Sequence, residues 1–374
     1  MKHKSALQKK ISFCITRKNQ ILRYMGGYFV IHTASFLSRK QTEKLNKEKS
    51  VENLIPGKIQ TNTGLDGIHS YVYPIIKMHL PSISVILPVY NMESFIFQAV
   101  DSILKQTFES FELIIIDDAS TDNTRTVLDG FEDSRIIRIY NPYHTGNYRC
   151  RNQGLDIAKG KYIAVMDGDD IAHSDRLRKQ HTFMESNPRY MAVGTDIEFF
   201  SESSPSCVLQ RTRDEALLKV QLLKDNVCTH PTLIIRQEIF NKYGIKYNED
   251  YEYSADYDLM VNISRIGAIS NLPEVLLSYR RHPGQISHAK RQAQWVYADQ
   301  IRLKQLEAFK IRPSIDEIIL HLSLMKGFAI PASKHLSAVK WCNKLLTKND
   351  MLKLYDEKFL YRFLEESCCL CMKI

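Results

Sequence analysis

Three carboxylates stand within four residues at positions 167–170, directly after an apolar run at residues 161–166. The run contains β-branched, aromatic and apolar side chains, which predicts a buried strand. Carboxylates crowded at the end of a strand repel one another unless a cation neutralises them. Ligand sets made only of oxygen suit a hard divalent ion, which can also hold a phosphate. The alternative is a solvated acidic turn, because residues 256–258 repeat the same Asp-x-Asp spacing.

The surrounding sequence favours the metal site, because other polar clusters also follow predicted strands. Four apolar runs alternate with helical patterns, and they occupy residues 83–90, 111–116, 135–140 and 161–166. This alternation predicts an α/β fold with a mainly parallel central sheet and helices on both faces. In such sheets, ligands bind beyond the carboxyl ends of the strands. Polar residues at 88–91, 117–118 and 167–170 follow three of these strands, so we expect them to converge on one crevice.

Local signals predict where the first elements begin and end. Pro88 is expected to end the first strand, because proline cannot donate a hydrogen bond to a central ladder. Asn91 is expected to cap the following helix, whose apolar positions repeat with a helical period. After the second strand, Asp122 or Thr121 is expected to cap a helix that runs to about Gly130.

Helix and strand patterns continue to alternate beyond the aspartate cluster. We expect helices from residue 174 and over residues 215–225, and strands over residues 191–200 and 230–236. An acidic, aromatic segment at residues 248–259 leads into a helix with Ser254 as its N-cap. From about residue 287 to the end the pattern is helical, which predicts a helical C-terminal region.

The positive charge of the chain is concentrated near its start. The 374 residues have a net charge of +9, and residues 1–80 contain fourteen Lys and Arg against four acidic residues. This basic N-terminal extension can lie on anionic lipid headgroups, which attract Lys and Arg. The alternatives are a poorly ordered tail, or sequence upstream of a true start at Met78, which lies five residues before the first strong strand.

Composition excludes several classes of protein. Eight cysteines without paired metal-binding spacing fit a reducing cytoplasm rather than a disulfide scaffold. No apolar run approaches the roughly 20 residues that a membrane span needs, and we expect no signal peptide. The near-neutral body of the chain argues against a nucleic-acid partner.

Seven motifs, in order, resemble those of family-2 glycosyltransferases of the GT-A fold. They lie at residues 84–91, 117–122, 150–154, 160–163, 167–170, 255–259 and 279–282. The last two look like acceptor-side motifs of the family. The resemblance implies a GT-A catalytic domain at residues 81–288, followed by the helical region at 289–374. Within the catalytic domain it implies a nucleotide-binding half at about 81–195 and an acceptor half at about 196–288.

The resemblance also implies the reaction and the residues that carry it. It implies an inverting transferase that uses a nucleotide-activated donor, most often a UDP-sugar, with Mn²⁺ or Mg²⁺. Asp256 falls where the family places its catalytic base. Asp169 would be the main metal ligand with Asp167 and Asp170 close by, and His282 is a further candidate for the metal shell. The side chains expected to bind the nucleotide sugar are Pro88, Tyr90, Asn91, Asp118, Arg151 and Asp167.

The residue types agree with this chemistry. A divalent ion that bridges the diphosphate oxygens neutralises charge as the leaving group departs. Inversion needs one base on the opposite side of the sugar ring, to take a proton from the acceptor hydroxyl. At a helix start, Asp256 is expected to be solvated and stabilised by the helix dipole unless an acceptor covers it. Its alternative is an ordinary first-turn acid. His230 is expected to be a partnered structural histidine rather than part of the acceptor pocket.

Two departures from the family pattern bear on function. Ala255 stands where many relatives carry a glutamate before the base, which puts support from that carboxylate in doubt. Processive members carry a Gln-x-x-Arg-Trp motif and membrane spans, whereas residues 292–295 read Gln-Ala-Gln-Trp. We therefore expect one sugar to be added in each encounter.

These observations predict a hexosyltransferase-type enzyme of lipopolysaccharide, capsule or similar surface polysaccharide synthesis. Its acceptor would be a glycan or a lipid-linked glycan, and it would act in the cytoplasm with peripheral contact to the inner face of the membrane. The C-terminal helices either lie on the membrane or pack against the catalytic domain. One alternative is a non-catalytic nucleotide-sugar-binding subunit, which would not need Asp256. The other is a sugar nucleotidyltransferase, which would need a phosphate loop that residues 89–93 do not resemble.

Overall fold

The computed structural model describes residues 80–201, 206–285 and 290–372, together with four strands before residue 75. The chain divides into two compact units, residues 1–79 and 80–374. The strands of the first unit are β1 (Gln20–Met25), β2 (Tyr28–Thr33), β3 (Thr61–Thr63) and β4 (His69–Pro74). They form an antiparallel sheet in the order β1-β2-β4-β3, which we had not predicted for this basic segment. Met78 lies outside the described residues.

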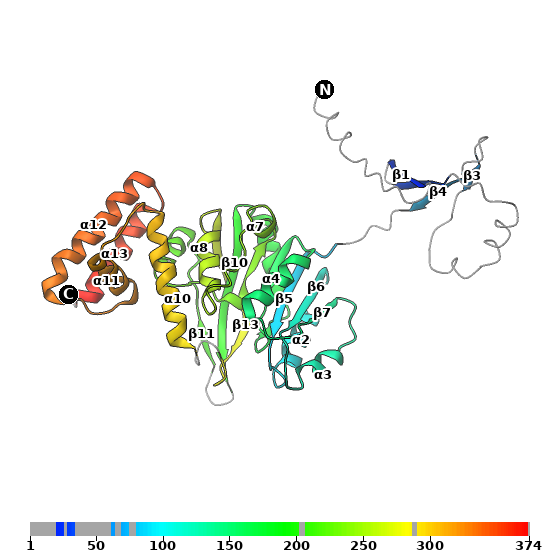
Figure 1. The fold of residues 1–374 in the computed structure, drawn as a ribbon, viewed down its shortest axis with the longest axis horizontal. Helices are drawn as coiled ribbons and strands as arrows, with labels where there is room; N and C mark the ends of the chain where they lie inside the picture. Colours follow the sequence, from blue (N-terminus) through cyan, green and yellow to red (C-terminus); the bar gives the residue numbers. More distant parts are fainter. Residues whose placement is uncertain are drawn as a thin grey trace, which may run out of the picture. The chain divides into compact units, whose positions relative to one another are not determined.

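Within the described residues, the second unit is built on one nine-stranded sheet (Figure 1). Its order is β7-β6-β5-β8-β12-β10-β13-β9, and β11 pairs with β10. The strands are β5 (Ile83–Val89), β6 (Phe111–Asp117), β7 (Ile136–Tyr140), β8 (Tyr162–Val165), β9 (Ile171–Ala172), β10 (Tyr190–Phe200), β11 (Cys207–Leu209), β12 (Ile234–Arg236) and β13 (Ala268–Arg280). Strands β7, β6, β5 and β8 run parallel, as predicted. β10 and β13 are also parallel, whereas β9, β11 and β12 are antiparallel to their neighbours, which the sequence did not predict.

Helices cover both faces of this sheet, which confirms the predicted α/β architecture. They are α2 (Ile96–Leu104), α3 (Thr124–Asp129), α4 (Asn147–Ile157), α5 (Arg176–Ser186), α6 (Glu215–Gln221), α7 (Glu238–Asn241) and α8 (Ala255–Ile263). Successive side chains of a strand point to opposite faces. Accordingly, Ile86 of β5 packs in a core with α4 and α8, whereas Leu87 packs in a second core with α2 and α5.

The C-terminal region is helical, as predicted (Figure 1). Its helices are α10 (Arg291–Lys304), α11 (Ile315–Lys326), α12 (His335–Leu352) and α13 (Glu357–Met372), with short 3₁₀ turns η2 (Gln305–Glu307) and η3 (Ala332–Lys334). A separate apolar core that includes Trp341 joins α11, α12 and α13. Ser314 and Glu317 form a capping box at the start of α11. None of the helices in the described part of the chain is long and apolar enough to cross a bilayer.

Two strand predictions were wrong in detail. β5 continues through Pro88, because β8 ends opposite Ile86 and therefore requires no hydrogen bond from the proline. The segment predicted as one strand at residues 230–236 begins as a 3₁₀ turn, η1 (His230–Thr232), and only β12 is extended. Pro231 at the start of η1 accounts for the difference, because proline fixes φ and is well tolerated in a first helical turn.

The predicted helix caps also differ from those in the structure. Asn91 does not cap α2 but adopts a left-handed φ of 53° and accepts a hydrogen bond from the backbone N–H of Thr121 at 2.8 Å. Asn123 occupies the N-cap position of α3, although Asp122 still accepts a hydrogen bond from its first turn. Ser254 occupies the predicted N-cap position of α8, but its hydroxyl donates to a carbonyl of α10 and makes no capping hydrogen bond.

A buried polar network fixes the turn that leads into β8. The hydroxyl of Ser84 donates to Glu112 Oε1 at 2.6 Å, and the same oxygen accepts the backbone N–H of Lys159 at 2.7 Å. The backbone N–H of Gly160 donates to Ser84 Oγ at 2.8 Å. A Cβ at Gly160 would lie 2.5 Å from the backbone nitrogen of Ser84. Direct backbone contact with β5 therefore positions the strand that carries the aspartate cluster.

We predict that Gly160→Ala lowers the free energy of unfolding by about 1–3 kcal/mol, the usual cost of overpacking. The added methyl group meets backbone atoms, which cannot move aside as a flexible side chain would. Urea denaturation followed by circular dichroism measures the change. Gly130→Ala is the matched control, because a Cβ there meets the carbonyls of Val127 at 3.4 Å and Thr126 at 3.9 Å, which are ordinary van der Waals contacts. Equal loss of stability in the two variants would contradict the prediction.

Candidate active site

The aspartate cluster lies at the carboxyl end of β8, where the sequence predicted it. Oxygens of Asp167, Asp169 and Asp170 lie within 4.8 Å of one another. Asp170 is fully buried, and its Oδ1 accepts the backbone N–H of Arg280 at 3.0 Å. Its Oδ2 has no hydrogen-bond partner among the described residues. Burial raises the pKa of Asp170 well above its ordinary value, and the charges of the other two carboxylates add to this effect.

Two buried arginines lie beneath the aspartate cluster. Arg151 of α4 is 1% exposed and donates from Nη2 to Asp167. Arg176 at the start of α5 is completely buried and donates from Nη2 to the carbonyl of Val165 at 2.7 Å. Burial lowers the pKa of Arg176 to about 10, so it stays charged at neutral pH. The two guanidinium groups therefore offset part of the negative charge of the cluster.

The end of β13 also contacts the aspartate cluster. Nε of Arg280 donates to the backbone carbonyl of Asp169 at 2.8 Å. Nε2 of His282 lies 3.1 Å from Asp169 Oδ2, so the structure brings this candidate ligand to the cluster. The motif at residues 279–282 resembled an acceptor-side motif, yet two of its side chains contact the predicted metal site. We had not singled out Arg280, although its place beside His282 in that motif was the available signal.

Asp118 lies beyond the end of β6, where its carboxylate is surrounded by donors from residues 141–146. Its Oδ1 accepts the N–H and the hydroxyl of Thr145, each at 2.8 Å, and its Oδ2 accepts the N–H of Gly146 at 2.7 Å. Although burial favours the neutral acid, hydrogen bonds from Thr145, Asn141 and Gly146 hold the pKa of Asp118 below its usual value. Asp118 is therefore an ionised carboxylate that fixes the 141–146 loop.

An aromatic pair lies next to this loop. The ring centroids of Tyr90 and His144 are 4.2 Å apart, with an angle of 40° between the rings. Tyr90 is 39% exposed. Nδ1 of His144 also lies 2.9 Å from Asp118 Oδ2. The pair presents ring surface at the end of β5, and sequence reasoning identified Tyr90 but missed His144.

Asp256 lies in the first turn of α8, and both of its oxygens are engaged. The hydroxyl of Tyr148 donates to Oδ1 at 3.0 Å, and the side-chain amide of Asn226 donates to Oδ2 at 2.9 Å. Burial raises the pKa of Asp256, whereas these two hydrogen bonds oppose the rise. Asp256 is half-buried, so our expectation of a solvated carboxylate holds only in part, because side chains distant in sequence cover part of this helix start. Neither partner was predicted.

One face of α4 joins Asp256 to the aspartate cluster. Tyr148 contacts Asp256, Arg151 contacts Asp167, and Asn152 holds the backbone of Tyr247 through two hydrogen bonds of 2.9 and 3.1 Å. Residues spaced three and four apart lie on the same side of a helix. The charge of Asp256 is also among the causes that raise the pKa of Asp167, so the two carboxylates lie close enough for their charges to interact.

Asp258, the other carboxylate of the second Asp-x-Asp sequence, and His230 both have partners within the protein. Asp258 is 3% exposed, and its oxygens accept hydrogen bonds from Lys304 at 3.0 Å and from Asn262 at 2.9 Å. His230 Nε2 lies 2.9 Å from the hydroxyl of Tyr247, and burial lowers the pKa of the imidazole well below its ordinary value. The prediction of a partnered, structural His230 is confirmed.

Comparison with known sequences identifies the family. The family model described as Glycosyl transferase family 2 matches residues 84–244. A Haemophilus influenzae protein named an uncharacterized glycosyltransferase is 32% identical over 265 residues, which cover 68% of this chain and 82% of that protein. The Escherichia coli UDP-Glc:alpha-D-GlcNAc-diphosphoundecaprenol beta-1,3-glucosyltransferase WfaP is 33% identical over 216 residues, which cover 56% of this chain and 80% of that enzyme.

Solved structures share the fold. The S. aureus TarS fragment 1–349, crystallised with UDP, matches with a TM-score of 0.51 and 18% identity, covering 78% of this chain and 88% of that one. The mannosyltransferase PcManGT from Pyrobaculum calidifontis, in complex with GDP-Man and Mn²⁺, gives a TM-score of 0.51 at 17% identity, covering 78% and 86%. From the sequence relatives, with a fold that agrees, this chain belongs to the family-2 glycosyltransferases.

Proposed function

We propose that this chain is a metal-dependent, inverting hexosyltransferase that moves one sugar from a UDP-sugar to a glycan or lipid-linked glycan acceptor. The acceptor belongs to a surface polysaccharide such as lipopolysaccharide or capsule. The observation that supports the proposal most is that side chains from one face of α4 contact both Asp256 and Asp167. Two E. coli relatives, WfaP and WfgD, are named as glucosyltransferases that use UDP-Glc and a diphosphoundecaprenol-linked acceptor, and they support the choice of substrates.

The residues of the cluster fit a divalent metal ion. Three carboxylates converge, and the buried Oδ2 of Asp170 lacks a partner in the part of the chain that the structure describes. We assign Asp169 as the main ligand, with Asp167, Asp170 and the imidazole of His282 beside it. This oxygen-rich set suits Mn²⁺ or Mg²⁺. When bound, such an ion would neutralise the charge that develops on the departing diphosphate.

Asp256 is the proposed catalytic base. Tyr148 and Asn226 fix the orientation of its carboxylate and favour the ionised form, while each oxygen keeps lone-pair capacity for an acceptor hydroxyl. Burial makes the carboxylate a stronger base than a solvated aspartate. The base would take the hydroxyl proton as the acceptor oxygen attacks the sugar from the side opposite the diphosphate.

The nucleotide would bind at the ends of β5 and β6. The exposed ring of Tyr90, backed by His144, offers a surface on which a uracil ring can stack. Pro88 and Asn91 flank Tyr90 on the same strand end. Asp118 would position the 141–146 loop beside the nucleotide, and Arg151 would position Asp167.

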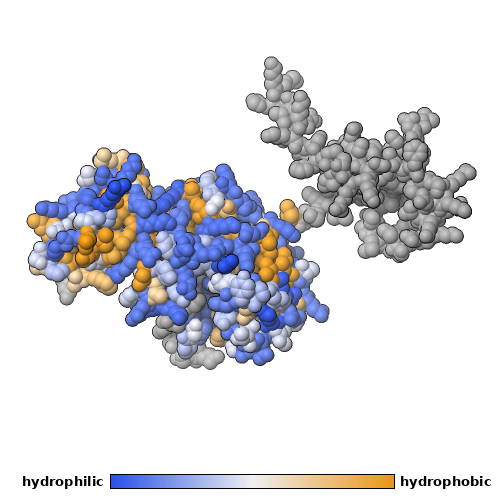
Figure 2. Space-filling model, in the orientation of Figure 1, coloured by the Kyte–Doolittle hydropathy of each residue, from blue (hydrophilic) through white to orange (hydrophobic). Residues whose placement is uncertain are grey.

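Peripheral contact with the inner face of the cell membrane completes the proposal. Figure 2 shows hydrophobic residues gathered over the C-terminal helices. The exposed apolar side chains of this region include Ile315, Ile319, Phe328, Leu336 and Val339. A lipid surface would cover such side chains and bring a lipid-linked acceptor near the crevice.

The two alternative functions are less well supported. A non-catalytic nucleotide-sugar-binding subunit has no need for a carboxylate held by two dedicated donors beside the donor site. A sugar nucleotidyltransferase needs a Gly- and Lys-rich phosphate loop after the first strand, and the sequence at residues 89–93 lacks that composition.

Asp256→Asn is expected to lower kcat by about 10²–10⁴-fold, the range that general base catalysis contributes. The amide cannot accept the hydroxyl proton, while UDP binding should stay unchanged. Mass spectrometry of products, with a panel of UDP-sugars and an undecaprenyl-diphosphate-GlcNAc acceptor, measures the transfer. The control is Asp250→Asn, an exposed acid in the same segment that should retain activity. Normal turnover by Asp256→Asn would rule out this base.

Tyr148→Phe is expected to move the acidic limb of the kcat/KM–pH profile to higher pH. The hydrogen bond from Tyr148 lowers the pKa of Asp256, so its removal raises that pKa and protonates the base at a higher pH. Activity should fall on the acidic side and recover above the new pKa. Asn226→Ala should move the limb in the same direction, and Tyr143→Phe, at an exposed tyrosine, should not. An unmoved limb in both test variants would contradict the assignment.

Asp169→Ala is expected to abolish the effect of Mn²⁺ on UDP binding. In the unmodified protein, UDP and Mn²⁺ at 100 times Kd should add about 2.7 kcal/mol to the free energy of unfolding. Thermal unfolding with UDP, in the presence of Mn²⁺ or of a chelator, measures this difference. Asp156→Ala, on an exposed part of α4, is the control and should keep the full effect. A metal effect that persists in Asp169→Ala would show that the ion binds elsewhere.

A further inference from the structure

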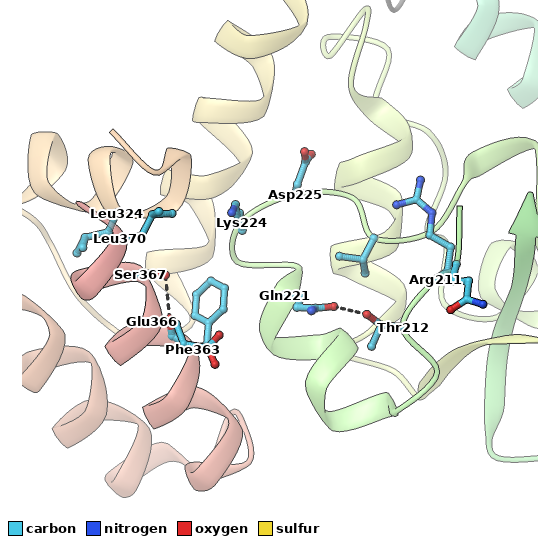
Figure 3. A pocket seen from close by; sticks show the side chains of 12 residues that line it. Arg211, Thr212, Gln221, Lys224, Asp225, Leu324, Phe363, Glu366, Ser367 and Leu370 are labelled. Carbon is cyan, nitrogen blue, oxygen red and sulfur yellow. Dashed lines mark hydrogen bonds between the residues drawn. The ribbon is translucent and has the colours of Figure 1, made fainter. Parts of the chain in front are cut away.

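A second cleft lies between the catalytic domain and the C-terminal helices (Figure 3). Its volume is about 400 Å³, which falls within the 300–1,000 Å³ of typical small-molecule sites. Residues that follow β11, together with α6 and the segment after it, form one wall. Residues of α11 and α13 form the other wall. The motifs that predicted the aspartate cluster contribute no side chain to this cleft.

The two walls differ in chemistry. On the catalytic-domain wall, the hydroxyl of Thr212 donates to Gln221 Oε1 at 2.7 Å, which orients the amide and leaves its NH₂ group available to a ligand. On the helical wall, the half-buried ring of Phe363 lies near Leu370, which is 62% exposed. A sugar ring matches such a pair of walls, because it has an apolar C–H face and a rim of hydroxyl groups.

The charges in the cleft favour a neutral ligand. Two cations, Arg211 and Lys224, and two acids, Asp225 and Glu366, line it. The formal charges of these four lining residues cancel at neutral pH, although Glu366 is also paired with Arg362 at 2.8 Å. The lining itself therefore has no strong excess of positive charge with which to attract a phosphate or diphosphate. Carboxylates and amides are, in contrast, good partners for sugar hydroxyls, because they accept or donate hydrogen bonds in several directions.

The cleft shares a wall segment with the catalytic base. Asp225 and Val227 line the cleft, while Asn226 between them donates to Asp256 Oδ2 at 2.9 Å. The backbone N–H of Asn226 also donates to Asp225 Oδ1 at 2.8 Å. Residues 225–227 thus connect the cleft directly to Asp256, which would take the proton from the acceptor hydroxyl.

We propose that this cleft binds neutral oligosaccharide units of the acceptor, remote from the hydroxyl that reacts. The inference rests on the proposed glycosyl transfer and names the part of the substrate that the C-terminal helices recognise. Phe363 stacks on the C–H face of a sugar, and Gln221 and Glu366 bond its hydroxyls. These helices then belong to the acceptor site and do more than complete the fold.

Isothermal titration calorimetry with three neutral trisaccharides, chitotriose, laminaritriose and maltotriose, tests the inference in the absence of donor and metal. We expect at least one of them to bind to the unmodified protein and to Asp256→Asn alike. Phe363→Ala and Gln221→Ala, on opposite walls, should each weaken that binding at least tenfold. Tyr361→Ala, which removes an exposed aromatic ring from the same helix, should leave it unchanged.

Binding of none of the three sugars would overturn the inference, as would unchanged affinity in either wall variant that retains the circular dichroism spectrum of the folded protein. Inorganic pyrophosphate serves as the anionic probe, and its binding in place of the sugars would also overturn it. Failure of the proposed function gives a different result. In that case Asp256→Asn transfers sugar normally, or the protein transfers none, while the trisaccharide still binds in the cleft.

Discussion

The rest of the active site depends on the negative charge that gathers at the end of β8. Three carboxylates have oxygens within 4.8 Å of one another, and burial together with the neighbouring charges raises the pKa of Asp167 and of Asp170. The guanidinium groups of Arg151, Arg176 and Arg280 offset this negative charge in part. A divalent cation would add two positive charges among the carboxylates. Its charge would then attract a diphosphate to the site.

Two elements, β13 and α4, hold the charged groups of the site in place. The end of β13 brings Arg280 and His282 to Asp169, so the strand and the aspartate turn are fixed to each other. The face of α4 that carries Arg151 also carries Tyr148, the partner of Asp256. A change in the tilt of α4 would therefore move Asp256 and the aspartate cluster together. The distance between them would then stay the same.

The sequence predicted the parallel half of the sheet because each crossover helix has its own apolar period. It did not predict that β12 runs antiparallel, because a strand buried on both faces shows the same apolar run in either direction. Motif order located the three aspartates and Asp256. The donors to Asp256 lie 108 and 30 residues away, and their residue types fit many surface positions. Such contacts arise from packing and leave no periodic signal.

We propose roles for two motif residues that differ from those that the resemblance implies. Asp118 and Arg151 match positions that would touch the nucleotide, yet protein groups already occupy both side chains. Three residues of the 141–146 loop donate to Asp118, and Arg151 is paired with Asp167 in a buried contact. To expose either group to a ligand, the protein would have to break these bonds and leave a buried charge unpaired, which is costly. In this proposal the exposed rings at the end of β5 recognise the nucleotide base directly, and Asp118 holds the loop that carries His144.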